Sequence, residues 1–70
     1  MIRIEENKVK LKKYIEHWAE HNDEHTARFR ESAEKAEEMG LQEAARALRA
    51  ATEAGEAVSA HLKKAGESIA

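Results

Sequence analysis

The sequence contains no cysteine and no proline, and its three glycines are isolated from one another. The lack of cysteine excludes disulfides, thiolate metal ligands and a cysteine nucleophile. The lack of proline leaves nothing that forces a break within a helix. The isolated glycines exclude a glycine-rich loop that could cradle phosphate groups. The chain can therefore form long helices, and any chemistry it performs depends on other side chains.

Long apolar runs and a concentrated basic surface are also absent. No stretch approaches the roughly 20 apolar residues that cross a membrane, and no signal-peptide pattern is present. The 12 lysines and arginines are interspersed with 14 aspartates and glutamates, which gives a net charge of −2. Nucleic-acid binding needs a concentrated basic face. We therefore expect no nucleic-acid partner, no membrane association and a cytoplasmic location.

The first half of the chain has the pattern of a helix that packs along one seam. Apolar or seam-compatible residues recur at alternating steps of four and three, which is the heptad spacing of coiled coils. Asn7 is a plausible N-cap and predicts a first helix over about residues 8–38. Ile4 continues the seam, so an earlier helix start and an extended arm over residues 1–4 are both open alternatives. The predicted seam consists of Leu11, Ile15, Trp18, Asn22, His25, Phe29, Ser32, Ala36 and Met39.

Gly40 marks the end of the first helix. Glycine suits the left-handed position after a helix, and Leu41 can pack back on Ala36 as in a Schellman motif. After a turn at residues 39 and 40, a second helix is predicted over about residues 41–66. Helices joined by so short a turn run antiparallel, so the predicted fold is all-α, a two-helix hairpin forming one domain over residues 1–70. The predicted seam of the second helix consists of Leu41, Ala44, Leu48, Ala51, Gly55, Val58, Leu62, Ala65 and Ile69.

The short turn also predicts the register of the two helices and their need for a partner. Folding at Gly40 pairs residues whose numbers sum to about 80. The predicted pairs are Phe29 with Ala51, His25 with Gly55, and Trp18 with Leu62. A single seam in a chain of 70 residues buries little apolar surface. We therefore expect a homodimer that forms a four-helix bundle, or docking on a larger protein.

Histidines are the residues of this chain most suited to chemistry. His17, His21 and His25 recur at steps of four, which places them one above another on a helix. In the predicted seam His25 points inward, His21 flanks it and His17 lies further out, while His61 reaches the level of His21 from the second helix. Imidazole binds zinc, nickel, copper and cobalt, and it must be neutral to do so. The four histidines are therefore candidate ligands of one divalent ion.

Several alternatives compete with the metal site. Exposed histidines on charged helices often have no ligand, and a polar seam residue such as Asn22 or His25 can serve only to fix register. The pattern H-x-x-E-H, found in a class of zinc peptidases, occurs twice in residues 17–25. Glu20 is predicted to face solvent, however, and so small a hairpin offers no wall for a substrate cleft. We therefore expect no enzyme activity and no catalytic residues.

The block His17-Trp18-x-Glu20-His21-Asn22-x-x-His25 continues through Phe29-Arg30, Ala33-Glu34-Lys35-Ala36 and Gly40-Leu41. It resembles the histidine-containing C-terminal extension of some nickel-binding accessory proteins of the carbon monoxide dehydrogenase system, over roughly residues 11–65. The resemblance implies a metal, nickel in the first place, carried by His17, His21 and His25. Those proteins carry a small β-domain in front of the helical part, which this sequence does not contain.

Two hypotheses follow for function. The first is a non-enzymatic module that binds a divalent transition metal, nickel favoured over zinc, copper or cobalt, for storage, delivery or sensing. Its candidate ligands are His17, His21, His25 and His61. The second is a structural module that self-associates, or a small subunit of a larger complex, whose histidines have no metal role.

Overall fold

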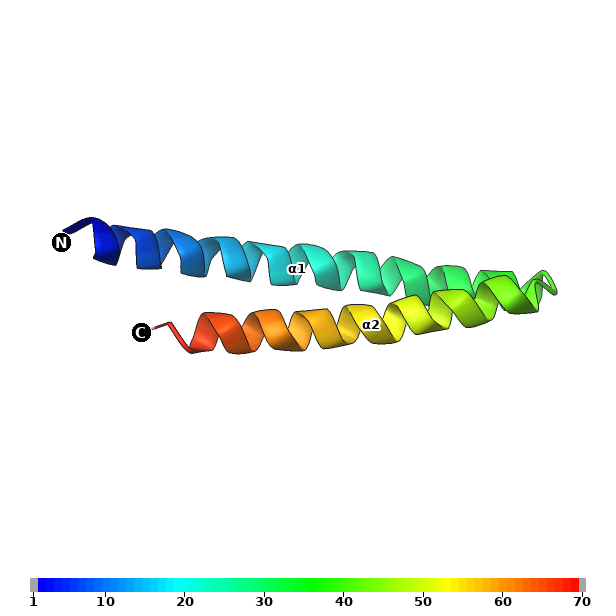
Figure 1. Cartoon of the computed structure of the whole chain (residues 1–70). Coiled ribbons are helices and arrows are strands. Elements are labelled where there is room, and N and C mark those ends of the chain that lie inside the picture. The colour runs from blue at the N-terminus through cyan, green and yellow to red at the C-terminus, as the bar shows by residue number, and fades with distance from the viewer. Residues whose placement is uncertain (1, 70) are drawn as a thin grey trace.

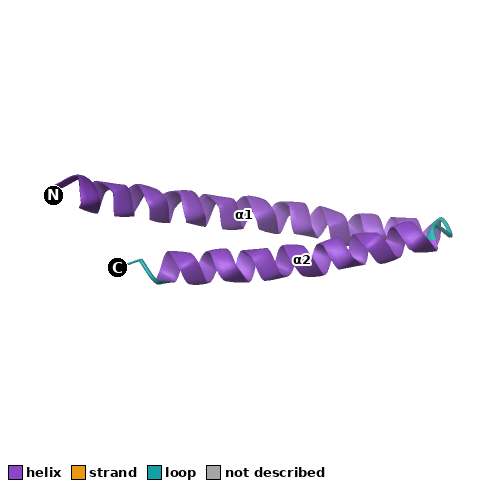
Figure 2. Cartoon of the chain, in the orientation of Figure 1, coloured by secondary structure: helices purple, strands orange, loops and turns teal. Residues whose placement is uncertain are grey.

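The protein is an elongated antiparallel hairpin of two α-helices (Figures 1 and 2). The computed structural model describes residues 2–69, and these span 58 × 14 × 12 Å. Helix α1 comprises Ile2–Glu38 and helix α2 comprises Gln42–Glu67. The predicted all-α hairpin is confirmed. No helix within residues 2–69 combines the length and apolar character needed to span a membrane.

Helix α1 begins earlier than its predicted start near residue 8. It is already helical at Ile2, so Asn7 lies inside the helix and its prediction as an N-cap is wrong. No glycine or proline interrupts the segment, and Glu5 in the first turn complements the positive end of the helix dipole. The earlier start is therefore correct, and the extended arm is wrong from Ile2 onward; Met1 lies outside the described residues.

The turn has the predicted Schellman geometry. Gly40 has a positive φ of 77°, and its N–H donates to the carbonyl of Glu37 at 3.0 Å. The N–H of Leu41 donates to the carbonyl of Ala36 at 2.8 Å. These two bonds satisfy carbonyls that the end of α1 would otherwise leave unpaired. Helix α2 starts at Gln42 and ends at Glu67, each one residue later than predicted.

The register of the hairpin agrees with its prediction. A side chain at Gly66 would contact Ile15, and one at Gly55 would contact Thr26, so the facing residue numbers sum to 81. By the same register Ile69 lies at the level of Lys12. Residues 2–11 of α1 therefore extend beyond the end of α2, as Figure 1 shows.

About half of the predicted seam residues are wrong, because each helix turns a different side toward the other helix than the one predicted. Ile15 and Ala36 lie in the seam as predicted and are buried. Trp18, His25 and Ser32, however, do not lie in the seam of α1. The residue that follows each of them lies there instead: Ala19, Thr26 and Ala33, all buried.

Helix α2 is rotated in the matching sense. Gly55 is buried as predicted, while the predicted Val58 is 45% exposed. The buried positions of α2 are Ala45, Thr52, Gly55, Ser59 and Gly66. Small side chains on both helices let the two axes approach closely, and this close approach replaces the predicted packing of large residues against small ones. Thr26, and not His25, therefore lies opposite Gly55.

The rotation gives the hairpin two unlike sides. On one side, which we call the charged flank, ion pairs join the helices: Arg30 with Glu56, Arg49 with Glu37, and Lys63 with Asp23. The heptad positions on the opposite side form the apolar flank. It consists of Ile4, Leu11, Trp18, His25 and Ser32 of α1, of Met39 in the turn, and of Ala44, Ala51, Val58 and Ala65 of α2.

Candidate functional site

The histidines of α1 form a ladder next to the apolar flank. The ring centroids of His21 and His25 are 4.6 Å apart and nearly perpendicular, at 87°. Those of His17 and His21 are 6.1 Å apart and nearly parallel, at 5°. The cause is the spacing of four residues, which stacks successive side chains along one side of the helix. His25 is half-buried beside the seam, whereas His17 and His21 are exposed.

The predicted convergence of all four histidines does not occur within one chain. Across residues 2–69, no three histidine or acidic side chains are arranged to hold a metal ion together. His61 is exposed on α2 and adds no third ligand to the α1 ladder. The metal-binding role of His17, His21, His25 and His61 therefore stays a prediction, and a single chain offers at most a pair of ligands.

His21 and His25 are the pair best placed to share an ion. Two histidines four residues apart on one helical face are the spacing that zinc peptidases use to chelate a metal. In the described part of the chain, no hydrogen bond or ion pair engages either imidazole. Their nitrogens are thus available to a ligand, and the pair can supply two coordination bonds to one ion.

A polar cross-link joins the helices at the same level, on the other side of the seam. The Asn22 amide donates from Nδ2 to the Gly55 carbonyl and to Oγ of Ser59, both at 2.7 Å. The Ser59 hydroxyl in turn donates to the Asp23 carboxylate. Nζ of Lys63 lies 3.4 Å from that carboxylate. Asn22 was considered from the sequence as a polar seam residue that can serve to fix register, and these bonds across the seam are of the kind that such a role requires.

The rest of this cross-link was missed from the sequence. The predicted seam passed through Val58 and so left Ser59 outside it. A rotation of the helix by one residue brings Ser59 inward and places Asp23 and Lys63 on the charged flank beside it. The signal available in the sequence was a row of small residues at Ala45, Thr52, Ser59 and Gly66, spaced by seven.

The carboxyl group of Asp23 has a lowered pKa. The hydrogen bond from Ser59 stabilises the carboxylate and lowers the pKa of Asp23 below its ordinary value of 3.8. Partial desolvation opposes this effect, and Lys63 adds to it by a hydrogen bond and by its positive charge. The side chain is half exposed, so solvent screens these interactions.

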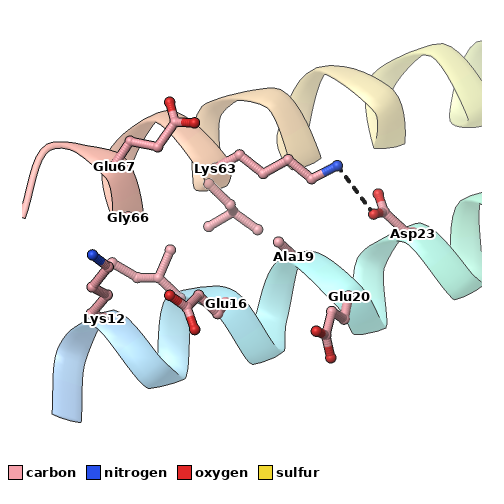
Figure 3. Close-up of a pocket in the computed structure, with 10 residues that line it drawn as sticks. Lys12, Glu16, Ala19, Glu20, Asp23, Lys63, Gly66 and Glu67 are labelled. Atoms are coloured by element: carbon pink, nitrogen blue, oxygen red, sulfur yellow. Dashed lines mark ion pairs between the residues drawn. The ribbon is translucent and has the colours of Figure 1, made fainter. Parts of the chain in front are cut away.

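A groove lies on the charged flank near the C-terminal end of α2, between residues 12–23 of α1 and residues 62–67 of α2. Figure 3 shows Lys63 extended toward Asp23 across it, with Glu16, Glu20 and Lys12 on the α1 side. The small residues Ala19 and Gly66 leave room between the two helices. Its rim carries both signs of charge, and no histidine lines it. The groove and the histidine ladder are therefore separate features.

These features define a small, two-helix α-hairpin with a polar cross-link in its seam and a histidine ladder beside it. The chain belongs to the family described as a domain of unknown function, DUF8180, which matches residues 11–69. The matched range coincides with the part of the hairpin in which the two helices face each other. No curated protein matches the chain, and no solved structure matches it.

Proposed function

We propose that this hairpin is a non-enzymatic module that binds a divalent transition metal ion through His21 and His25. The observation that carries the proposal is the 4.6 Å separation of the two imidazole rings on one side of α1. Imidazole without thiolate suits nickel, zinc, copper and cobalt. The resemblance to nickel-handling accessory proteins favours nickel among these.

The ion would keep open coordination positions. His17 lies one turn before His21 and eight residues from His25, about 12 Å along the axis, so it extends the ladder without joining the pair at one ion. Two protein ligands leave coordination positions open to water or to an acceptor protein. An open site suits reversible storage, delivery or sensing better than permanent structural binding.

Calorimetric titration tests this proposal. Ni²⁺ and Zn²⁺ are titrated separately into the wild-type chain and into His21→Ala, His25→Ala and His61→Ala. We expect His21→Ala and His25→Ala each to weaken binding by 10-fold or more, since each removes one of two ligands, on the order of 1.4 kcal/mol or more. His61→Ala is the matched control and should bind as the wild type does. Equal, millimolar-only binding by all four proteins would reject the proposal.

A second candidate function is self-association without a metal. The observation that favours it is the apolar flank, where Leu11, Trp18 and Val58 are each about half exposed. Chelator-treated protein discriminates the two functions. If it purifies without metal, binds none in the titration, and keeps full helicity and its oligomeric state, the histidines serve packing only.

A further inference from the structure

The apolar flank of the hairpin is exposed. Trp18 is 49% exposed, Met39 is 71% exposed and Leu11 is 47% exposed, all in one heptad row that follows α1 into the turn. Val58 of α2 stands beside this row at 45% exposure. Tyr14 stacks on Trp18 at a ring-centroid distance of 6.0 Å and extends the aromatic surface outward. Among the described residues, the apolar flank therefore leaves large side chains exposed, whereas the neighbouring buried seam positions of α1 hold the small residues Ala19, Thr26 and Ala33.

The amount of exposed surface is what a dimer interface requires. The chain exposes 5689 Å², whereas a compact monomer of 7.9 kDa exposes about 4,400 Å². The excess is about 1,300 Å². Each partner in a stable complex contributes about 800 Å². The hairpin thus carries enough excess surface to form one standard interface.

The two ends of the hairpin carry opposite charge. The basic end, residues 2–13, has five positive and two negative side chains: Arg3, Lys8, Lys10, Lys12 and Lys13 against Glu5 and Glu6. The acidic turn end, residues 31–50, has five negative side chains and three positive: Glu31, Glu34, Glu37, Glu38 and Glu43 against Lys35, Arg46 and Arg49. A second copy whose long axis runs the opposite way brings unlike ends together, whereas one that runs the same way brings like ends together.

The apolar residues at the two ends are complementary in the same sense. Residues 2–11 have no α2 beside them, and they present Ile4 and Leu11 along the apolar flank. At the turn end, Met39 and Leu41 are exposed. In a reversed second copy, the turn of one hairpin covers the part of α1 that α2 does not reach. In a copy of the same direction, that part meets only its own equivalent.

We propose that a second copy of this chain covers the apolar flank, related by a two-fold axis perpendicular to the long axis, so that the two α1 helices run antiparallel. The proposal deepens the second candidate function and holds with or without a bound metal. The row from Ile4 to Met39 is centred between Trp18 and His25. Ile4 therefore faces the partner's Met39, and His25 faces the partner's Trp18. The axis passes at the level of His21.

The interface is tested by two substitutions to aspartate. Val58 lies on the apolar flank, whereas Ala60 is exposed beside Glu56 and Lys63 on the side of the charged flank, away from both ends. In chelator-containing buffer, light scattering should give the wild type twice the 7.9 kDa mass of one chain. Val58→Asp should weaken dimerisation at least 10-fold, while Ala60→Asp leaves it unchanged. A wild-type chain that is monomeric at micromolar concentration, or equal effects of the two variants, would overturn the interface.

The direction of the second copy is tested with spin labels at positions outside the proposed interface. The labelled chains therefore keep that interface intact. Labels are attached to Glu20→Cys and Glu34→Cys, two exposed positions fourteen residues apart on one side of α1. The chain has no native cysteine, so labelling is unique. Antiparallel copies predict an axial separation of about 38 Å at position 34 and under about 5 Å at position 20.

Pulsed electron–electron double resonance measures the distance between the two labels of a dimer, which increases with their axial separation. A distance at position 34 that exceeds the one at position 20 by 15 Å or more supports the antiparallel arrangement. Equal distances at the two positions show that the turns lie at the same end, and they overturn the arrangement. The absence of any label–label distance in the wild-type background overturns the dimer itself. Neither measurement depends on a bound metal. A failure of the metal-binding proposal would be seen separately, by calorimetry.

Discussion

Thr26 of α1 fits directly over Gly55 of α2, and no other residue type fits at position 55 without displacement. A Cβ at Gly55 would overlap the Thr26 hydroxyl and come within 3.2 Å of both side-chain carbons. Thr26 is held by a 2.8 Å hydrogen bond from Oγ1 to the Asn22 carbonyl, and its branched side chain has few alternative rotamers. This contact sets how closely the two helices approach.

Gly55→Ala should therefore destabilise the hairpin although alanine favours helices. The gain in helix propensity is about 1 kcal/mol, and overpacking costs about 1–3 kcal/mol. Urea unfolding followed by circular dichroism should show a net loss of up to about 2 kcal/mol. Gly66→Ala is the matched control: its Cβ would lie at an ordinary 3.5 Å from Cγ2 of Ile15, so we expect unchanged or raised stability. Stabilisation by both substitutions would contradict the close approach at Thr26.

Asn22→Ala should lower the free energy of unfolding by about 1–3 kcal/mol, because Ser59 and the Gly55 carbonyl lose a partner inside the seam. Asn7→Ala is the control, since Asn7 lies on the part of α1 that α2 does not reach. Its effect should stay within about 0.5 kcal/mol. Chemical denaturation at neutral pH measures both. Equal effects at the two asparagines would show that the cross-link adds nothing to stability.

Acid should weaken the hairpin through Asp23. Its pKa in the folded chain is lowered by Ser59 and Lys63, so the stabilisation is fully present above the unfolded value, near 3.8, and is lost as pH falls through the lower folded value. Asp23→Asn should be less stable than the wild type at pH 6, and the difference should shrink below about pH 4. Thermal unfolding across this range measures it.

Glu24→Gln provides the comparison for this pH series, because Glu24 joins none of the ion pairs in the described part of the chain. Its stability should follow that of the wild type at every pH. A stability difference between Asp23→Asn and wild type that stays constant down to pH 2 would show that Asp23 carries no favourable interaction in the folded state.

Gly40→Ala should destabilise the turn, because an alanine must adopt a φ of 77° there. The left-handed conformation costs a residue with a Cβ about 1–2 kcal/mol. The surroundings offer no steric reason for the loss, since no atom lies within 4 Å of an added Cβ. Gly40→Asn should recover part of the stability, because asparagine tolerates this conformation better. Equal losses for both variants would argue against a conformational cause.

The sequence was sufficient to predict the hairpin, its turn and its register. A chain without proline, with one glycine between two heptad patterns, has few other folds, and the Gly40 cap fixes where the helices meet. The side of each helix that forms the seam was not predictable in the same way. Both helices carry two rows that could form a seam, one with more hydrophobic residues such as Trp18 and Val58 and one with small residues such as Ala19 and Ser59. Heptad spacing fits either row, and hydrophobicity favoured the wrong one.

The candidate site was predicted only in part for the same reason. The spacing of His17, His21 and His25 predicted a ladder on α1, which the structure contains. The convergence with His61 depended on the side chosen for the seam, and it does not occur within one chain. The hydrogen bonds that link Asn22, Ser59 and Asp23 could be predicted only if Ser59 was known to lie in the seam. That depends on which side of α2 faces α1, and heptad spacing alone does not determine it.

The proposed binding of one divalent ion by His21 and His25 has a clear spectroscopic signature. Proton NMR of the imidazole rings during addition of substoichiometric Ni²⁺ detects it, because the paramagnetic ion broadens the signals of the rings that hold it. We expect the His21 and His25 ring signals to broaden first and together, while those of His61 stay sharp. Uniform broadening of all four histidines only at millimolar Ni²⁺, or broadening of His61 before His21 and His25, would contradict it.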